Sequence, residues 1–179
     1  MMAGHAWVGD LALQHLDAAY NLARWVLGSD ADAPDAVHDA YLRAARAAHT
    51  YAGGDARAWW LAIVRNCCLA RIAARKREPS LEQAEGARLI DALLRTPDDE
   101  VEAQASAAQV GQHVERALRT LPVEFREALV LREIEGLSYR EIADVLDVPI
   151  GTVMSRLSRG RALLQRGLGI PMQEALHGL

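Results

Sequence analysis

The sequence predicts an all-α protein made of two small helical domains joined by an acidic linker. Three observations support this fold class. About half of the residues are hydrophobic (51%), and the good helix formers Ala, Leu, Arg and Glu are frequent. No long run of Val, Ile and Thr suggests a sheet. Apolar residues recur at helical spacing in two stretches, separated by a charged segment that contains proline.

The charges are segregated along the chain. Residues 56–77 hold six basic residues and no acid, and residues 148–167 hold four arginines and no acid. Residues 81–105 instead hold seven acids against two arginines. The formal net charge of −4 taken alone argues weakly against nucleic-acid binding. This distribution, however, predicts two basic surfaces and an acidic connector. For nucleic-acid binding, the sign of the local charge therefore matters more than the net charge of the whole chain.

The N-terminal domain is expected at residues 5–78 and begins with two helices. The first runs from about residue 10 to residue 27, where Gly-Ser-Asp stops it. Asp32 is a candidate N-cap for the second helix, and Pro34 fits its first turn. We expect this second helix to end near residue 49.

A third helix is expected from residue 56 toward residue 77. Its inward face is predicted to carry Trp59, Ile63, Cys67 and Ile72. Cys67 and Cys68 are adjacent, where a disulfide would be strained, and no His or Cys spacing completes a zinc site. We therefore expect reduced thiols in a cytosolic protein. Residues 79–107 form the predicted acidic linker, and residues 169–179 form a C-terminal tail.

The C-terminal domain is expected at residues 108–168 and is strongly patterned. Pro122 begins one of its helices, and that helix closes near Gly136. Ser138 and Glu141 have the spacing of a capping box at the start of the next helix. The tight turn at Asp147-Val148-Pro149 leads into the last helix, so these two helices are predicted to form a helix-turn-helix unit.

The last helix carries the residues that we expect to contact duplex DNA. Val153 and Leu157 should pack on the preceding helices. Hydroxyl and guanidinium groups project elsewhere, where arginine can recognise guanine edges and hydroxyls can hold phosphates. These candidate residues are Thr152, Ser155, Arg156 and Arg159. A merely solvated arginine face is the alternative interpretation.

The third helix has the composition of a surface for single-stranded DNA. Unpaired bases stack on aromatic rings while phosphates follow basic side chains. The helix interleaves aromatic, amide and cationic groups, at Arg57, Trp59, Trp60, Arg65, Asn66 and Arg71. At least one tryptophan is expected to be core, so packing accounts for part of this pattern.

Two sets of motifs resemble a known family. Residues 32–44 (DAPDAVHDAYLRA) and 58–66 (AWWLAIVRN) resemble region 2 of extracytoplasmic-function sigma factors of RNA polymerase. Residues 121–129 (LPVEFREAL), 136–143 (GLSYREIA) and 148–157 (VPIGTVMSRL) resemble region 4 of the same family. The resemblance covers nearly all of the chain except the linker and the tail.

The resemblance implies a role for each set of residues. A surface for the clamp helices of the polymerase β′ subunit is implied at Asp35, Asp39, Leu42 and Arg43. Melting and capture of the promoter −10 element are implied for Tyr51, Arg57, Trp60, Arg65, Asn66 and Arg71. Recognition of the −35 element as duplex is implied for Thr152, Ser155, Arg156 and Arg159. The implied partners are core polymerase, through its β′ clamp helices and β flap, promoter DNA and an anti-sigma factor.

Some positions depart from the family's pattern. Pro34 stands where an acid is usual, and Met154 stands where a lysine is common. Gly160 replaces an alanine, which should cost about 1 kcal/mol of helix stability. These departures bear on promoter preference rather than on the class of protein.

Two other functions remain open on the residues alone. The first is a helix-turn-helix regulator that is not a sigma subunit, although no α/β receiver pattern appears. The second is an enzyme using His38-Asp39, but the histidines lack metal-ligand spacing. We expect no catalytic residue, no metal site and no cofactor. The sequence shows no signal peptide and no membrane-spanning run, so a cytoplasmic location is expected.

Overall fold

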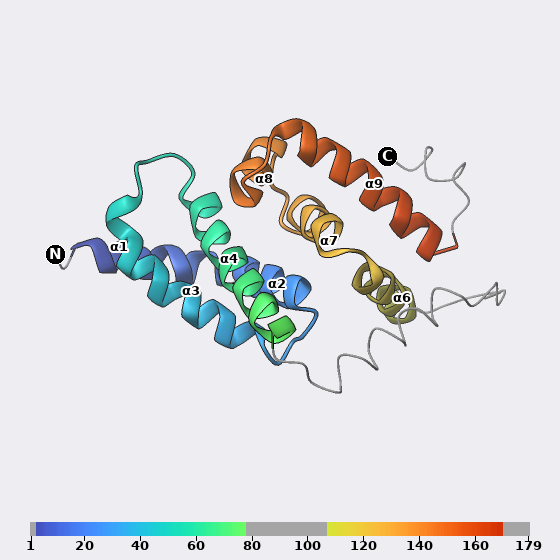
Figure 1. The fold of residues 1–179 in the computed structure, drawn as a ribbon, viewed down its shortest axis with the longest axis horizontal. Helices are drawn as coiled ribbons and strands as arrows, with labels where there is room; N and C mark the ends of the chain where they lie inside the picture. Colours follow the sequence, from blue (N-terminus) through green and yellow to red (C-terminus); the bar gives the residue numbers. More distant parts are fainter. Residues whose placement is uncertain (1–2, 78–106, 170–179) are drawn as a thin grey trace.

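The computed structural model describes residues 3–77 and 107–169, and all regular structure in these ranges is helical (Figure 1). The all-α prediction is therefore confirmed. The N-terminal half contains α1 (Ala3–Gln14), α2 (Leu16–Leu27), α3 (Ala33–Ala47), the 3₁₀ turn η1 (Ala48–Thr50) and α4 (Ala56–Arg77). The C-terminal half contains α6 (Ala107–Thr120), α7 (Val123–Leu129), η2 (Val130–Ile134), α8 (Tyr139–Leu146) and α9 (Ile150–Gly167). The predicted linker and tail lie almost wholly outside the described residues.

The first predicted helix is two helices. The chain leaves helical geometry at His15, where φ is −118° and ψ is 29°, so α1 and α2 meet at a bend. Neither proline nor glycine lies between residues 10 and 27, so the local sequence does not mark this break. The prediction of one continuous helix was wrong at this point.

Small residues let α3 lie close to its neighbours. Four alanines at helical spacing, Ala33, Ala36, Ala40 and Ala44, are fully buried on one face of the helix. Pro34 lies in the first turn, as predicted. Asp32 is the N-cap residue, but its side chain makes no capping hydrogen bond. Its carboxylate instead lies 2.7 Å from Arg75 near the end of α4, and this bond lowers the pKa of Asp32.

The C-terminal half contains the predicted helix-turn-helix. Ser138 Oγ accepts a hydrogen bond from the Glu141 amide, and the Glu141 carboxylate accepts one from the Ser138 amide. The predicted capping box is thus confirmed, and hydrogen bonding of the Glu141 carboxylate to the side chain and the amide of Ser138 lowers the pKa of Glu141. Asp147 closes α8 in the left-handed region, with φ of 53°, and the chain then turns into α9.

The helix that begins after Pro122 changes character before its end. Beyond Leu129 it continues as the π-helical turn η2, in which the Glu135 amide donates to the carbonyl of Val130. Gly160 of α9 packs against this helix. A Cβ at Gly160 would lie 3.1 Å from Leu129 Cδ1, so the missing side chain permits the close approach of α7 and α9. This contact gives Gly160 a packing role that helix propensity alone does not reveal.

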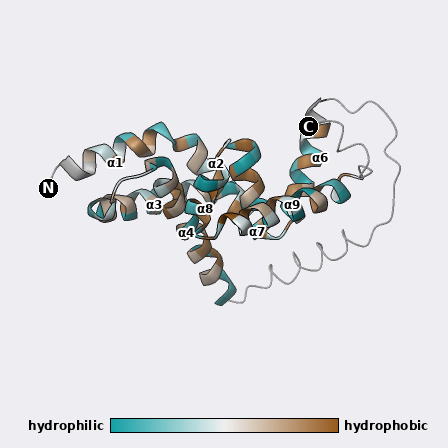
Figure 2. Ribbon diagram, turned by 90° about the horizontal axis from the view of Figure 1, so that it is seen from above, coloured by the Kyte–Doolittle hydropathy of each residue, from teal (hydrophilic) through white to brown (hydrophobic). Residues whose placement is uncertain are grey.

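The two halves share one apolar core. Helix α4 lies along α8, and α2 lies against α7 (Figure 1). Hydrophobic segments of both halves meet there when the chain is seen from above (Figure 2). Two separate apolar clusters were expected from the sequence, and the described core is instead continuous. The domain boundaries themselves stay a prediction.

Candidate nucleic-acid and polymerase interfaces

The core-facing side of α4 differs from the predicted one. The buried residues are Ala58, Trp60, Leu61, Val64, Cys67 and Cys68, whereas Trp59, Ile63 and Ile72 are only half-buried. Trp60 has 0% exposure. Its ring is therefore closed to an unpaired base in this conformation, and the assignment of Trp60 to −10 DNA stays a prediction. Apolar residues occur all around α4, which makes its inward face ambiguous from periodicity.

Three arginines of α4 that we predicted for −10 DNA are each paired with a carboxylate. Arg71 binds Asp39 of α3 within the N-terminal half, and this bond raises the pKa of Arg71. Arg57 and Arg65 instead bind acids of the C-terminal half. Asn66, the predicted amide contact, is exposed.

Glu127 of α7 lies at the centre of the strongest of these contacts. Its carboxylate is 1% exposed and accepts two hydrogen bonds from Arg65, at 2.7 Å from Nε and 2.9 Å from Nη2. Arg156 of α9 adds a third, with Nη1 3.3 Å from Oε1. Paired arginines compensate a carboxylate that would be costly to bury alone. We call Glu127, Arg65 and Arg156 the Glu127 cluster.

Glu135 makes the second contact across the halves. Its Oε1 accepts from Asn21 Nδ2 of α2 at 3.0 Å, and its Oε2 lies 3.3 Å from Arg57 Nη2. The same guanidinium nitrogen donates to the Glu135 carbonyl at 3.0 Å. The Glu135 side chain is 8% exposed. Its side chain is therefore held by residues of the N-terminal half.

An aromatic cluster supports the loop before α4. The rings of Trp7, Tyr51 and Trp59 lie with centroids 5.2–5.5 Å apart. Tyr51 also donates its hydroxyl to the Gly54 carbonyl at 2.6 Å, which closes the loop. Tyr51 was predicted as a −10 contact. The role of Trp7 could not be predicted, because nothing in its local sequence links it to a loop so far along the chain.

Helix α9 presents a mixed surface. Ser155 and Arg159 are exposed and Thr152 is half-buried, while Val153 and Leu157 are buried as predicted. The Ser155 hydroxyl donates to the Thr152 carbonyl at 2.9 Å. Arg156 was expected on an open face opposite the core. It lies instead at the edge of the core, because Glu127 holds its guanidinium.

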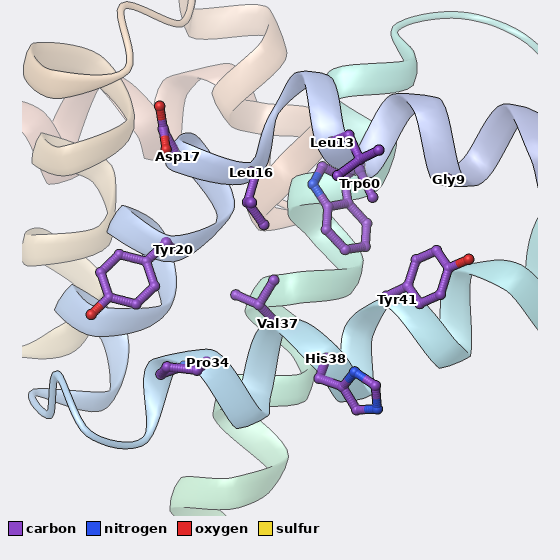
Figure 3. Close-up of a pocket in the computed structure, with 11 residues that line it drawn as sticks. Gly9, Leu13, Leu16, Asp17, Tyr20, Pro34, Val37, His38, Tyr41 and Trp60 are labelled. Atoms are coloured by element: carbon purple, nitrogen blue, oxygen red, sulfur yellow. The ribbon is translucent and has the colours of Figure 1, made fainter.

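Helix α3 carries the predicted polymerase surface. Asp35, Leu42 and Arg43 are exposed, whereas Asp39 is half-buried beside Arg71. An apolar groove of about 610 Å³ borders this helix (Figure 3). Leu13 and Leu16 lie across it from Val37 and Tyr41, and Trp60 forms part of its wall. This groove was not predicted, because its sides come from separate helices.

The two cysteines are buried and form no disulfide. Burial raises the pKa of Cys67, and it raises the pKa of Cys68 to about 12. A raised pKa disfavours the reactive thiolate. Among residues 3–77 and 107–169, no three His, Cys, Asp or Glu side chains meet as a metal site would require. None of the described helices is long and apolar enough to cross a membrane.

Comparisons with known proteins match both halves. Residues 11–78 match the family model described as Sigma-70 region 2, and residues 112–164 match Sigma-70, region 4. The chain is 35% identical over 156 residues to the ECF RNA polymerase sigma factor SigE of Mycolicibacterium smegmatis, covering 87% of this chain and 59% of that protein. It is 34% identical over 148 residues to the ECF RNA polymerase sigma-E factor of Haemophilus influenzae, covering 80% and 77%.

Solved structures show the same fold. The chain is similar to the sigma factor RpoE of Bartonella quintana, solved in complex with the anti-sigma factor NepR. The TM-score is 0.68 at 26% identity, and the match covers 89% of this chain and 94% of that one. CnrH, solved with the cytosolic domain of CnrY, gives a TM-score of 0.57 at 25% identity over 90% and 87% of the two chains.

Proposed function

Because this chain belongs to the extracytoplasmic-function family of RNA polymerase sigma factors, we propose that it binds core polymerase and directs transcription initiation at specific promoters. In this proposal the N-terminal half melts the −10 element and the C-terminal half recognises the −35 element. The observation that carries the proposal is the pair of arginine-rich helices, α4 and α9, one in each half of the chain.

The −10 surface consists of α4 and the loop before it. Asn66 is exposed and available to an unpaired base. The half-buried Tyr51 and Trp59 rings, which pack on each other and on Trp7, are the candidate stacking groups. Arg57, Arg65 and Arg71 supply the positive charge for the phosphates of the displaced strand. Trp60 is outside this set as long as its ring is buried.

The −35 surface consists of the exposed part of α9. Ser155 and Arg159 are open to the major groove, with Thr152 beside them. Arg159 is the better candidate for a base contact, because Glu127 already engages Arg156. Arg156 reaches DNA in this proposal only when that bond is released.

Helix α3 and the adjoining groove are the proposed surface for core polymerase. Asp35 and Arg43 offer charges of both signs, and Leu42 offers an apolar contact that is 39% exposed. The clamp helices of β′ are the proposed partner here, and the β flap is the proposed partner of the C-terminal half. An anti-sigma factor is a further proposed partner, by analogy with the Bartonella sigma factor and its anti-sigma factor NepR.

The proposed activity is binding and strand opening without catalysis by the chain itself, and the proposed location is the cytoplasm. A helix-turn-helix regulator that acts without polymerase is the weaker alternative, since both halves of the chain match sigma regions.

Binding to core polymerase tests the α3 assignment. The Asp35→Ala, Arg43→Ala double variant should bind core polymerase at least about tenfold more weakly in a fluorescence-anisotropy titration. Asp10→Ala, which removes an exposed charge from α1, is the control and should bind normally. Equal affinity of the double variant and the wild type would contradict the surface on α3.

A further inference from the structure

Two acids of the C-terminal half occupy arginines that the proposed function assigns to DNA. Glu127 holds Arg65 through two hydrogen bonds, and Glu135 holds Arg57 through its carboxylate and its carbonyl. Glu127 belongs to α7, Glu135 directly follows η2, and both arginines belong to α4. The contacts therefore join the proposed −35 module directly to the proposed −10 helix.

Arg65 cannot bind a phosphate through Nε and Nη2 in this arrangement. The Arg65 side chain is 14% exposed, and the bidentate geometry directs its Nε and Nη2 at the Glu127 carboxylate. A phosphate offers the same kind of anionic, bidentate acceptor to a guanidinium. One donor pair cannot satisfy both acceptors, so a DNA strand on Arg65 requires Glu127 to leave.

Hydrogen bonds at the other end of the interface also join the two halves of the chain. Arg119 of α6 donates to the Gly28 carbonyl at 2.9 Å and lies 3.3 Å from Asp30, both in the turn after α2. Asn21 of α2 donates to Glu135. Together with the continuous apolar core, these bonds fix the two halves in one relative position.

We propose that the segment from α7 to Glu135 is a docking surface for α4, on which Glu127 and Glu135 compete with the phosphates of the −10 strand. In the closed chain the −35 module engages Arg57 and Arg65 of the −10 helix. Separation of the two halves exposes Arg57 and Arg65 together, and it leaves Arg156 paired with Glu127, because both of these residues lie in the C-terminal half. This proposal rests on the proposed function, because it takes α4 to be the −10 helix.

The competition has a measurable consequence. If only the open form binds the strand, the apparent association constant of the free chain equals that of the open form multiplied by the fraction of chains that are open. A variant that weakens the interface raises this fraction and should bind more tightly. In this proposal, binding to polymerase separates the two halves, so the same variant should have no effect on strand binding by the holoenzyme.

Glu135→Ala is the test variant, and Glu133→Ala is its matched control. The Glu135 side chain bonds to Asn21 and Arg57, both in the N-terminal half, so its removal spares the bonds within the C-terminal half. Glu133 lies two residues away and pairs with Arg161 of α9 at 2.7 Å, inside the C-terminal half. Both changes remove one carboxylate from the same stretch of chain.

The probe is a fluorescein-labelled single-stranded 12-mer carrying the non-template −10 sequence of a promoter obtained by start-site mapping. Anisotropy titration of the free full-length chain should show at least about fivefold tighter binding for Glu135→Ala and no change for Glu133→Ala. Glu127→Gln should act in the same direction as Glu135→Ala, with circular dichroism confirming that it folds. Small-angle scattering should give a larger radius of gyration for Glu135→Ala than for the wild type.

The outcomes separate the two proposals. Unchanged strand affinity and radius of gyration in Glu135→Ala and Glu127→Gln would overturn the docking surface, provided that the wild-type holoenzyme starts transcription. An equal gain in Glu133→Ala would also overturn it, because general loss of negative charge would then explain the effect. A wild-type chain that starts no transcription with core polymerase would instead overturn the proposed function.

Discussion

Replacement of Glu127 by alanine should cost more stability than replacement of any exposed acid. The carboxylate is 1% exposed and accepts three charge-assisted hydrogen bonds, two from Arg65 and one from Arg156. Removal of one partner from a buried ion pair costs about 3–5 kcal/mol, because the other charge stays buried without compensation. Arg65 and Arg156 are 14% and 22% exposed and keep some access to water, so we expect about 3 kcal/mol.

Double-mutant cycles divide this loss between the two arginines. The bidentate contact should give a coupling energy of about 2 kcal/mol between Arg65 and Glu127, against about 1 kcal/mol between Arg156 and Glu127. Urea unfolding followed by circular dichroism supplies each free energy of unfolding. A loss below about 1 kcal/mol in Glu127→Ala would refute the burial argument. Zero coupling to Arg65 beside clear coupling to Arg156 would show that the two halves are apart in the free chain.

Three further predictions test other parts of the structure. Ser138→Ala should lower the free energy of unfolding by about 1 kcal/mol through loss of the capping box, as urea unfolding can measure. The same change should raise the depressed pKa of Glu141, which an NMR titration measures. In the wild type, the stabilising contribution of Glu141 is present above its ordinary pKa and is lost as the pH falls through the depressed pKa. This contribution should be smaller in Ser138→Ala. Cys68, whose pKa burial raises to about 12, should resist thiol reagents at pH 8 until urea unfolds the chain. Trp7→Ala should loosen the loop that carries Tyr51 and so weaken strand opening, whereas Trp7→Phe should restore strand opening. Equal activity of both variants on closed and pre-melted templates would argue against this positioning role.

The features that could be predicted from sequence are those set by neighbours in the chain. The capping box of Ser138 and Glu141 spans a single helical turn, so its residue spacing is enough to locate it. The helix-turn-helix and the first-turn position of Pro34 are local in the same sense. Each depends on backbone geometry within a few residues.

The inward face of α4 could not be settled in this way. Trp59 and Trp60 are adjacent, and the apolar residues of α4 lie on all of its sides. Two different faces of the helix therefore fit the helical spacing of a core-facing side. Packing against α2 and α3 selects Trp60 for the core. The inward face predicted with Trp59 differed from the observed one because tertiary packing decides between the two rings.

The pairing of Arg65 with Glu127 is also tertiary. Sixty-two positions separate the two residues, and no pattern in the chain connects them. The charge pattern marked Arg65 as a DNA contact but could not show that a carboxylate of the same chain occupies it. The Glu127 cluster therefore became visible only when the two halves were seen in contact.

Initiation with purified components tests the central claim most directly. Core polymerase would be incubated with the full-length chain and a genomic DNA library, and the 5′ ends of the transcripts would be sequenced. We predict discrete start sites, absent with core polymerase alone, that share two upstream elements at a fixed spacing near −10 and −35. Arg159→Ala should alter preference only in the upstream element. Transcripts without discrete starts, or starts identical to those of core polymerase alone, would contradict the assignment of this chain as a sigma subunit.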